Sequence, residues 1–280
     1  MKALAVALAG FALVCCRASA APTALPDFEH VVLVVLENKE STDIVGSRSA
    51  PAFNLYGRVY ARIANYYAVT HPSLPNYLAL VGGSTFGITT NCVDCDIDAA
   101  SLADSIEASG RTWKAYIEGL PRRGFAGGAA GRYAKKHNPF AYFRRIMGDP
   151  TRANRIVPSG ELAGDLATKR LPDFALVVPD LCNSTHDCPV ATGDAWIRRT
   201  VGPLLGLPRT VVFITYDEGA TDRRGGGHVA TVAAGTAVRR HAVFRPLTGH
   251  YGLLRTIEQA WGLPYLGRSA RTRPITGIWR

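Results

Sequence analysis

The chain has 280 residues, 47% of them apolar, which fits one large globular domain or two small ones with a substantial core. It carries 32 lysines and arginines against 22 aspartates and glutamates, a formal net charge of +10, and such a surface favours anionic partners. The basic residues occur singly or in short runs, without a zinc finger, an RNP-like motif or a long basic stripe. This pattern argues against a protein dedicated to nucleic acids.

The first twenty residues have the pattern of a secretory signal peptide. Lys2 is followed by an apolar run over residues 3–14, and Ala18-Ser19-Ala20 forms a small-residue cleavage site. The run is too short to remain as a membrane anchor, and no second run long enough follows. We therefore expect residues 21–280 to be secreted or periplasmic, without stable membrane insertion. A lipid-modified cysteine at position 15 or 16 is the alternative.

Apolar runs predict the strands. Residues 30–36 (HVVLVVL) are apolar throughout, which indicates a strand buried on both faces of a parallel sheet. Further strands are expected, in chain order, at residues 66–69, 112–117, 173–178 and 209–215, with another apolar run at 229–233.

Helical spacing of apolar side chains predicts the segments between these strands. Helices are expected over residues 51–63, from Ser73 to Gly82-Gly83, and over residues 101–110, 159–169, 192–205 and 250–261. Strands that alternate with helices indicate an α/β fold with a mostly parallel central sheet and helices on both faces. Because no repeat, linker or low-complexity tract divides the chain, residues 21–280 are expected to form a single domain.

Ser73 lies between two prolines, directly before an apolar run. The pattern places it at the N-cap of a helix, with Pro75 in the first turn. There a serine has unpaired backbone N–H groups and the positive end of the helix dipole beside it, which suits a hydroxyl that attacks phosphorus. An ordinary capping serine is the alternative.

Four cysteines follow the predicted leader: Cys92, Cys95, Cys182 and Cys188. An even number in an exported chain indicates two disulfides. The spacing suggests the local pairs 92–95 and 182–188, although three connectivities are possible. A four-cysteine zinc site is the alternative, against which an oxidising compartment argues. Between them, residues 118–135 are rich in glycine, alanine and arginine and are expected to form a loop or a lid.

Polar residues follow three buried strands directly: Glu37-Asn38, Asp180 and Asp217-Glu218. The carboxyl ends of parallel strands meet at one sheet edge, so these groups are expected to converge. Carboxylate and amide oxygens suit Mg²⁺, Ca²⁺ or Mn²⁺, with Zn²⁺ also possible. Asp217 and Glu218 can reach one ion only if the strand has already turned. Surface charges at strand ends are the alternative.

Five histidines lie beside loops or helix starts: His71, His137, His186, His228 and His250. Histidine can bind phosphate oxygens, protonate a leaving group or ligate a metal. For any one of them, an ordinary loop histidine is the alternative.

Seven segments in this order resemble a known family: HVVLVVLENKES, THPSLPNYLALVGG, YAKKHNPFAYF, CNSTHDCPVATGDAW, FITYDEG, GGGHVATV and HYGLLRTIEQAWGLP. The family is that of the phosphoesterases that unite secreted bacterial acid phosphatases with bacterial phospholipases C, within the alkaline-phosphatase-like superfamily. The resemblance spans nearly the whole chain after the leader. In length and segment order it is most similar to the small secreted acid phosphatases, which include phosphatidylinositol-3-phosphatase-like proteins.

The resemblance implies roles for nine residues. The metal-binding positions are Glu37, Asn38, Asp217 and Glu218. The nucleophile is Ser73, assisted by His186 and His137, and the substrate-binding residues are Asn76 and His228. His250 matches a motif position without an assigned role. Alkaline phosphatases proper hold two zinc ions with more Asp and His ligands, so Asn38 and Glu218 here favour a single divalent metal.

The implied function is an exported, metal-dependent acid phosphatase that acts on phosphate monoesters, with phosphoinositides among the expected substrates. Ser73 attacks phosphorus to give a phosphoserine, and a histidine, first of all His186, protonates the leaving alcohol. The alternatives are a phosphodiesterase of the phospholipase C type and a non-catalytic exported protein that binds anions. Sulfatases need a Cys-x-Pro-x-Arg segment that this chain lacks. The oligomeric state stays open.

Overall fold

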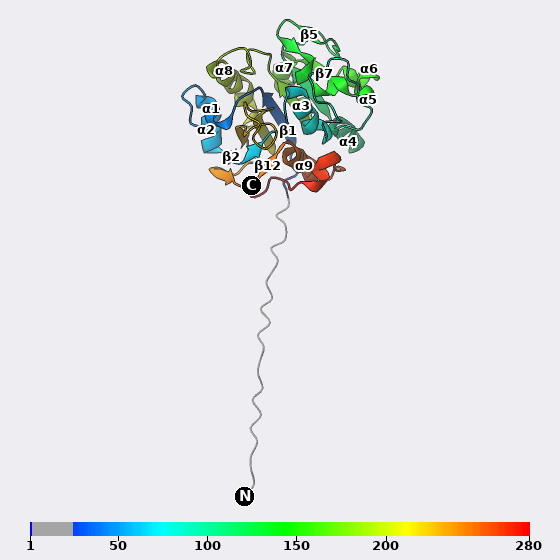
Figure 1. Cartoon of the computed structure of the whole chain (residues 1–280). Helices are drawn as coiled ribbons and strands as arrows, with labels where there is room; N and C mark the ends of the chain where they lie inside the picture. The colour runs from blue at the N-terminus through cyan, green and yellow to red at the C-terminus, as the bar shows by residue number, and fades with distance from the viewer. Residues whose placement is uncertain (2–24) are drawn as a thin grey trace.

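An eight-stranded sheet forms the centre of the computed structural model (Figure 1), which describes residue 1 and residues 25–280. In spatial order its strands are β11 (Ala242–Phe244), β2 (Ala61–Ile63), β10 (Thr231–Ala234), β9 (Thr210–Tyr216), β1 (His30–Leu36), β8 (Phe174–Val178), β4 (Trp113–Ile117) and β7 (Ile156–Pro158). Strand β10 runs antiparallel to both neighbours, and the other pairs are parallel. The predicted signal peptide lies outside the described residues, apart from its first residue.

Helices cover both faces of the sheet, as predicted. On one side α2 (Pro51–Val59) packs against α8 (Val190–Val201), and on the other α3 (Ser73–Gly82) packs against α9 (His250–Ala260) (Figure 1). The shorter α-helices are α1 (Ser41–Ile44), α4 (Leu102–Ala108), α5 (Arg144–Met147), α6 (Pro150–Ala153) and α7 (Glu161–Ala167). The three central strands β1, β8 and β9 are buried almost throughout, which explains their continuous apolar sequences.

Short elements complete the fold. Four 3₁₀ helices are present: η1 (Lys135–His137), η2 (Pro139–Tyr142), η3 (Gly202–Leu204) and η4 (Gly267–Arg271). Two small sheets pair β3 (Tyr66–Tyr67) with β12 (Thr248–Gly249), and β5 (Ala129–Ala130) with β6 (Tyr133–Ala134). The last pair lies in the predicted loop 118–135. Among the described residues, no helix has the length and apolar content needed to cross a membrane.

Several expected helices differ from the structure at their ends, among them the helices expected at 51–63 and 192–205. The predicted helix 51–63 stops at Val59, because residues 61–63 leave it and pair with β10 and β11 as strand β2. The predicted start at Thr192 is two residues late, since α8 begins at Val190, directly after Pro189. The capping box at Ser101 and Asp104 is confirmed: the Ser101 N–H donates to Asp104 Oδ2 at 2.7 Å.

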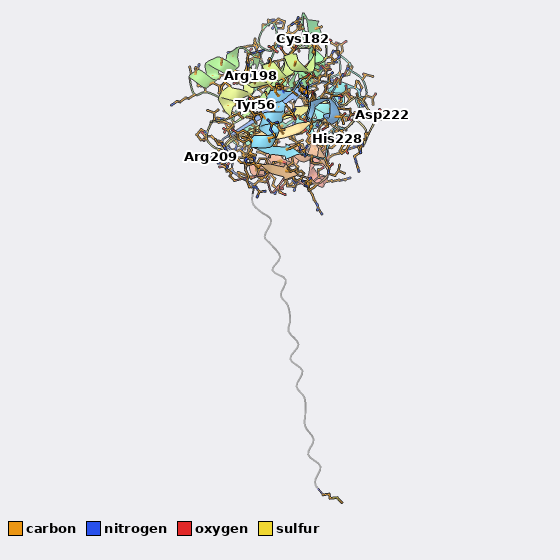
Figure 2. All side chains as sticks on the ribbon, turned by 90° about the vertical axis from the view of Figure 1, so that its left-hand side faces the viewer. Tyr56, Cys182, Arg198, Arg209, Asp222 and His228 are labelled. Carbon is orange, nitrogen blue, oxygen red and sulfur yellow. A yellow bond between two sulfur atoms is a disulfide. The ribbon has the colours of Figure 1, made fainter. Side chains whose placement is uncertain are left out.

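Both suggested disulfides are present, Cys92–Cys95 and Cys182–Cys188. The second closes the loop that carries His186 after strand β8. Figure 2 labels Arg209, which precedes β9, on the opposite side of the molecule from Asp222, which follows it. The carboxyl ends of the strands and the loops after them therefore face one side, where the predicted site lies.

Candidate active site

Two neighbouring strand ends supply the acidic groups. Strands β1 and β9 run parallel, with Leu36 opposite Tyr216, so Glu37 and Asp217 follow their strands side by side. The Asp217 N–H continues the ladder by donating to the carbonyl of Leu36 at 2.9 Å. Both carboxylate residues have no solvent exposure. The predicted convergence at the carboxyl edge of the sheet is therefore observed for this pair.

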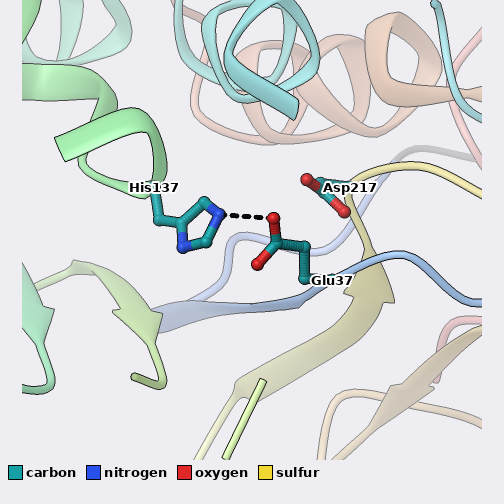
Figure 3. Close-up of side chains that lie close together, drawn as sticks. All are labelled: Glu37, His137 and Asp217. Atoms are coloured by element: carbon teal, nitrogen blue, oxygen red, sulfur yellow. Dashed lines mark ion pairs between the residues drawn. The ribbon is translucent and has the colours of Figure 1, made fainter. Parts of the chain in front are cut away.

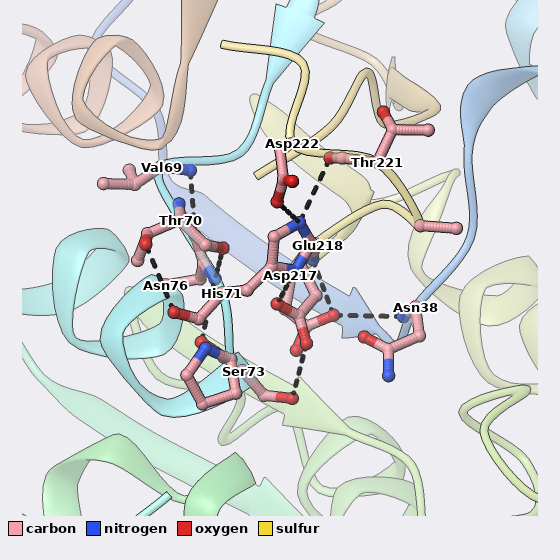
Figure 4. A network of polar contacts seen from close by, with 12 residues as sticks. Asn38, Val69, Thr70, His71, Ser73, Asn76, Asp217, Glu218, Thr221 and Asp222 are labelled. Atoms are coloured by element: carbon pink, nitrogen blue, oxygen red, sulfur yellow. Dashed lines mark hydrogen bonds and ion pairs between the residues drawn. The ribbon is translucent and has the colours of Figure 1, made fainter. Parts of the chain in front are cut away.

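The backbone turns immediately after both strands. Asn38 has a φ of +50°, and its N–H donates to Asp217 Oδ1 at 3.2 Å. The N–H of Glu218 donates to the same oxygen at 2.7 Å. This turn brings the Glu218 side chain to the same side as that of Asp217, as Figure 4 shows. The strand has therefore turned before Glu218, as both acids require if they are to serve one site.

Ser73 meets these acids from the start of helix α3. Its Oγ lies 3.0 Å from Glu37 Oε1 and 3.1 Å from Glu218 Oε1, and the residue is 1% exposed. A hydroxyl has one proton, so it donates to one carboxylate at a time. The hydroxyl is thus fixed between two acids that follow different strands. Figure 4 shows its contact with Glu218.

The helix start differs from the expected one. Pro72 is the N-cap and Ser73 is the first helical residue, whose side chain makes no capping bond. The Leu74 N–H donates to Asn91 Oδ1 at 3.0 Å, and Pro75 has no N–H. The first turn of α3 therefore has fewer unpaired N–H groups than the sequence suggested. The Ser73 hydroxyl makes no capping hydrogen bond and faces the acids.

Three buried oxygens at this point have no hydrogen-bond partner among the described residues: Glu37 Oε2, Asn38 Oδ1 and Asp217 Oδ2. Ligand atoms of Glu37, His137 and Asp217 lie within 4.8 Å of one another. Figure 3 shows these three side chains close together. Leaving buried polar atoms unpaired is unfavourable, and a hard cation held between Glu37 and Asp217 would be a partner for such oxygens. The residues present therefore fit a divalent metal ion.

Burial and mutual repulsion set the protonation of the acids. Burial, together with the charges of Glu37 and Glu218, raises the pKa of Asp217 well above its ordinary value. Burial also raises the pKa of Glu37, but the nearby His137 and Lys136 outweigh it and lower that pKa to about 2. For Glu218, burial raises the pKa despite the nearby His71. A positive charge between the three carboxyl groups would reduce their mutual repulsion.

Two of the histidines with an implied catalytic role reach the site. His137 Nε2 lies 2.7 Å from Glu37 Oε1, and its ring stacks on Tyr77. Burial lowers the pKa of His137, which favours the neutral imidazole that ligates metals. His186 Nε2 lies 3.9 Å from the same Glu37 oxygen, and its Nδ1 lies 2.6 Å from Asp187 Oδ1. His186 is the more exposed of the two, at the rim of the site.

The structure does not bring Asn76 to the site as a substrate-binding group. Its buried amide is fully used by the preceding loop: Oδ1 accepts from the N–H groups of Val69 and Thr70, and Nδ2 donates to the carbonyls of Thr70 and Pro72. Asn76 therefore shapes the segment that carries Ser73, as Figure 4 shows, instead of offering a free amide.

His228 also lies apart from the acids. Its Nε2 is 2.8 Å from the carbonyl of Ala64, and its ring stacks on Tyr67. Asp180, expected at the same sheet edge, accepts from the N–H groups of Cys182 and Asn183 and holds the disulfide loop. Neither residue contacts the Ser73 cluster among the described residues, so these expectations are not supported.

Two residues of the site have no assigned role in the sequence prediction: His71, which is only one of the five candidate histidines, and Lys136, which is not among the candidates. His71 Nδ1 lies 2.6 Å from Glu218 Oε2, and its Nε2 is 3.1 Å from the carbonyl of Thr221. Lys136 Nζ donates to Glu37 Oε1 at 2.7 Å. Both lie within segments that carry the family resemblance: His71 is two residues before Ser73, and Lys136 is one residue before His137. Their closeness in sequence to these predicted residues is the only feature that could have indicated them.

His250 contacts the backbone of the site at Asp217. This buried residue has Nε2 2.6 Å from the carbonyl of Asp217 and Nδ1 3.0 Å from the hydroxyl of Tyr66. It thereby links the start of helix α9 to the turn that carries Asp217 and Glu218.

Comparison with known proteins identifies the family of the chain. The profile described as the Phosphoesterase family matches residues 47–264. The chain belongs to the Phosphoesterase family. It is 36% identical over 265 residues to phosphatidylinositol-3-phosphatase of Mycobacterium tuberculosis, covering 92% of this chain and 85% of that protein. As a member of this family, it is a hydrolase that acts on phosphoric ester bonds.

An acid phosphatase of Aspergillus fumigatus is 32% identical over 256 residues, covering 86% of this chain and 56% of that protein. The chain thus spans little more than half the length of this fungal relative. Among solved structures, a protein of the alkaline phosphatase superfamily from Vibrio parahaemolyticus has a TM-score of 0.61 at 13% identity, covering 91% of this chain and 72% of the other. A 2-O GAG sulfatase has a TM-score of 0.59 at 12% identity, with coverages of 89% and 73%. The fold is therefore alkaline-phosphatase-like.

Proposed function

We propose that this member of the Phosphoesterase family is a metal-dependent phosphomonoesterase, an acid phosphatase that works through a phosphoserine at Ser73. The observation that carries the proposal is the position of the Ser73 hydroxyl, 3.0 and 3.1 Å from two buried carboxylates and beside three unpaired buried oxygens. A nucleophilic serine needs a fixed geometry and a means of losing its proton.

The reaction uses the chain's own groups as follows. Ser73 Oγ forms a bond to phosphorus, the bond from phosphorus to the leaving oxygen breaks, and the hydroxyl proton passes to Glu218 Oε1, 3.1 Å away. His186, at the rim, protonates the leaving oxygen. Water then attacks the phosphoserine along the reverse path, which releases phosphate and restores Ser73.

The metal ligands in this proposal are Glu37, Asn38, Asp217 and Glu218, the four positions expected from the sequence. The geometry adds His137 to this set, since it lies with Glu37 and Asp217, so we assign it to the metal in place of a direct catalytic role. One divalent ion there would lower the pKa of the serine hydroxyl and neutralise charge on the phosphoryl oxygens. Its identity is Ca²⁺, Mg²⁺, Mn²⁺ or Zn²⁺.

Positive groups around the serine suit the phosphoryl oxygens. Lys136 and His186 approach the same oxygen of Glu37, at 2.7 and 3.9 Å. Helix α3 directs its positive end toward Ser73. These groups offer charge-assisted hydrogen bonds to a phosphoryl dianion as the bond to Ser73 forms.

Phosphoinositides are the substrates that we propose to examine first. The mycobacterial relative is named for phosphatidylinositol 3-phosphate, and a net charge of +10 favours anionic lipid surfaces. The two disulfides support an exported, secreted or periplasmic location, because such bonds persist in oxidising compartments.

The test is hydrolysis of p-nitrophenyl phosphate by the purified chain, before and after EDTA, with each of the four ions added back. We expect activity that EDTA removes and one ion restores. Bis(p-nitrophenyl) phosphate and phosphatidylcholine are assayed in parallel. Faster turnover of these diesters would favour the phospholipase C-type alternative, and a folded protein inactive on all esters would favour an anion-binding protein.

A further inference from the structure

A depression with a volume of about 370 Å³ lies along the segment that leads to Ser73. Its walls come from the loop before Ser73, the loop before strand β10, the start of helix α9 and the C-terminal segment. The lining residues that matter below are Tyr67, Arg224, Thr248, Tyr251, Gly252 and Arg268. No aspartate or glutamate lines it among the described residues.

We propose that this depression is an anion subsite that binds a second phosphate group of the substrate whose first phosphate lies at Ser73. The inference rests on the proposed function and narrows its substrate class. The substrates would be phosphate monoesters that carry another phosphate on the same small scaffold, either as a free phosphate or as the phosphodiester of a lipid headgroup.

Helix α9 directs its N-terminus into the depression. The helix has eleven residues, and its N-cap, Gly249, has no side chain to cap the first turn. His250, Tyr251 and Gly252 form that turn and line the depression. First-turn N–H groups without intrahelical partners and the positive end of the dipole both favour an anion.

Two hydroxyl groups at this helix start point to a missing partner. Thr248 is 8% exposed, and its buried Oγ1 has no hydrogen-bond partner among the described residues. That hydroxyl faces the first turn, because a Cβ added at Gly252 would collide with it. The buried hydroxyl of Tyr251 likewise lacks a partner in the described part of the chain. Unsatisfied buried hydroxyls are unfavourable, and phosphate oxygens would accept hydrogen bonds from both.

Two arginines supply the positive charge. The Arg224 guanidinium lies over the ring of Tyr67, 5.3 Å from its centroid, and that of Arg268 lies over Tyr251 at 5.8 Å. Neither arginine forms an ion pair with an acid of residues 25–280. Guanidinium groups held on aromatic faces and free of acidic partners suit phosphate recognition.

Two residues that line the depression are tied to the active site. His250 lines it and has Nε2 2.6 Å from the carbonyl of Asp217. Val69 also lines it and precedes Ser73 by four residues, so the chain can separate these two residues by at most about 14 Å. A substrate with its first phosphate at Ser73 would have to span at most about this distance to place a second phosphate at the Val69 wall of the depression.

The first test compares Arg268→Gln with Arg271→Gln, a matched loss of charge at an exposed residue of the same 3₁₀ helix outside the depression. Three soluble substrates are used: p-nitrophenyl phosphate, inositol 1,3-bisphosphate and dibutanoyl phosphatidylinositol 3-phosphate. For Arg268→Gln, we expect the KM of a two-phosphate substrate to rise about tenfold or more relative to the KM for p-nitrophenyl phosphate. Arg271→Gln should leave this ratio unchanged.

The two two-phosphate substrates distinguish the source of the second phosphate. A shifted ratio for both supports recognition of phosphate whatever carries it, and a shift for the lipid alone supports a phosphodiester subsite. If the KM values for all three substrates change in the same proportion, or none changes, the subsite is refuted while the phosphatase activity stands.

The second test does not depend on turnover. Inorganic phosphate is titrated into the labelled protein, and the amide signals of Tyr251 and Gly252 are followed by NMR. Saturable shifts that are lost in Thr248→Val and Arg268→Gln support the subsite, and shifts that are absent or unaffected by both variants refute it. Thr248→Val keeps the shape and removes a hydroxyl without a partner, so the fold should tolerate it. If the protein hydrolyses none of the substrates, the proposed function fails, and this titration still decides whether the anion site exists.

Discussion

The metal hypothesis depends most on Asp217. It is fully buried, its Oδ1 holds the backbone of Asn38 and Glu218, and its Oδ2 has no partner among the described residues. Two further carboxyl groups stand beside it. Without a cation, the fold must tolerate the repulsion between these carboxylates or keep a proton on one of them. The pKa of Asp217 is raised for this reason, because burial and the neighbouring charges disfavour its ionised form.

Asp217→Asn tests this reasoning, because the amide keeps the Oδ1 hydrogen bonds and removes one charge. In EDTA we expect the variant to unfold at the wild-type temperature or above it, with a gain of about 1–2 kcal/mol. Added metal should raise the melting temperature of the wild type and leave the variant nearly unchanged. Phosphatase activity should fall at least about a hundredfold. A variant that keeps the metal-induced stabilisation would contradict the assignment of Asp217 as a ligand.

At this scale the sequence predicted more of the acids than of the bases. Glu37, Asp217 and Glu218 follow buried strands, so the topology of a parallel sheet alone brings them to one edge. His71 and Lys136 lie in a loop and a 3₁₀ helix, where no periodicity fixes the direction of a side chain. The family resemblance assigns Asn76 to the substrate, whereas the folded loop uses all of the hydrogen-bonding capacity of its amide.

Helix α3, which begins at Ser73, is anchored at its C-terminal end by Gly83. Gly83 has a φ of +68°, and a Cβ there would collide with the carbonyl of Leu266. The Arg268 N–H donates to the Gly83 carbonyl at 2.8 Å. The glycine pair that ends the predicted helix thus also joins α3 to the segment after α9.

Gly83→Ala is expected to lower the free energy of unfolding by about 3 kcal/mol or more, since it adds a backbone collision to an unfavourable φ. Gly110→Ala is the matched control: Gly110 has a φ of +78° but open space around the position of a Cβ. It should cost only about 1 kcal/mol. Urea denaturation of both variants measures the difference, and equal losses would contradict the packing argument.

Glu258 on helix α9 predicts a pH dependence away from the active site. Burial raises its pKa from 4.5 to about 7, although it accepts from the Leu266 N–H and the Ser269 hydroxyl. The native state therefore keeps a proton that the unfolded chain releases above pH 4.5. The stability from this group is full below pH 4.5 and is lost, by about 3 kcal/mol, as the pH rises through 7.

Urea denaturation at pH 4.5, 6 and 8 checks this expectation. Glu258→Gln should remove that part of the pH dependence, so that its stability relative to the wild type improves as the pH rises. Glu161→Gln, in the surface ion pair with Arg123, is the control and should change the pH profile little. Parallel profiles for the wild type and Glu258→Gln would show that Glu258 does not titrate in this range.

The long elements were predictable and the short ones were not. Strands β1, β8 and β9 are continuous apolar runs, and α9 has a clear apolar face, so their sequences specify them. Strands β2, β7 and β11 have three residues each, too few to show a period. β2 also continues the apolar pattern of α2 directly, and only its pairing with β10 and β11 shows that the helix has ended.

For the whole molecule, the positive net charge predicts a salt dependence that differs between substrates. The KM for phosphatidylinositol 3-phosphate in anionic vesicles should rise several-fold between 50 and 500 mM NaCl, because salt screens the attraction between the protein and the vesicle surface. Hydrolysis of p-nitrophenyl phosphate, which involves one small anion, should change less. The same salt response for both substrates would contradict a role for the surface charge.

The central claim is that Ser73 is the nucleophile, and the most direct measurement is the kcat of Ser73→Ala on p-nitrophenyl phosphate with saturating metal. Thr70→Ala is the control, a hydroxyl three residues earlier in the same segment. We expect Ser73→Ala to lose at least about a thousandfold in kcat while remaining folded, and Thr70→Ala to keep most of the wild-type rate. A folded Ser73→Ala variant with the wild-type kcat would contradict the account.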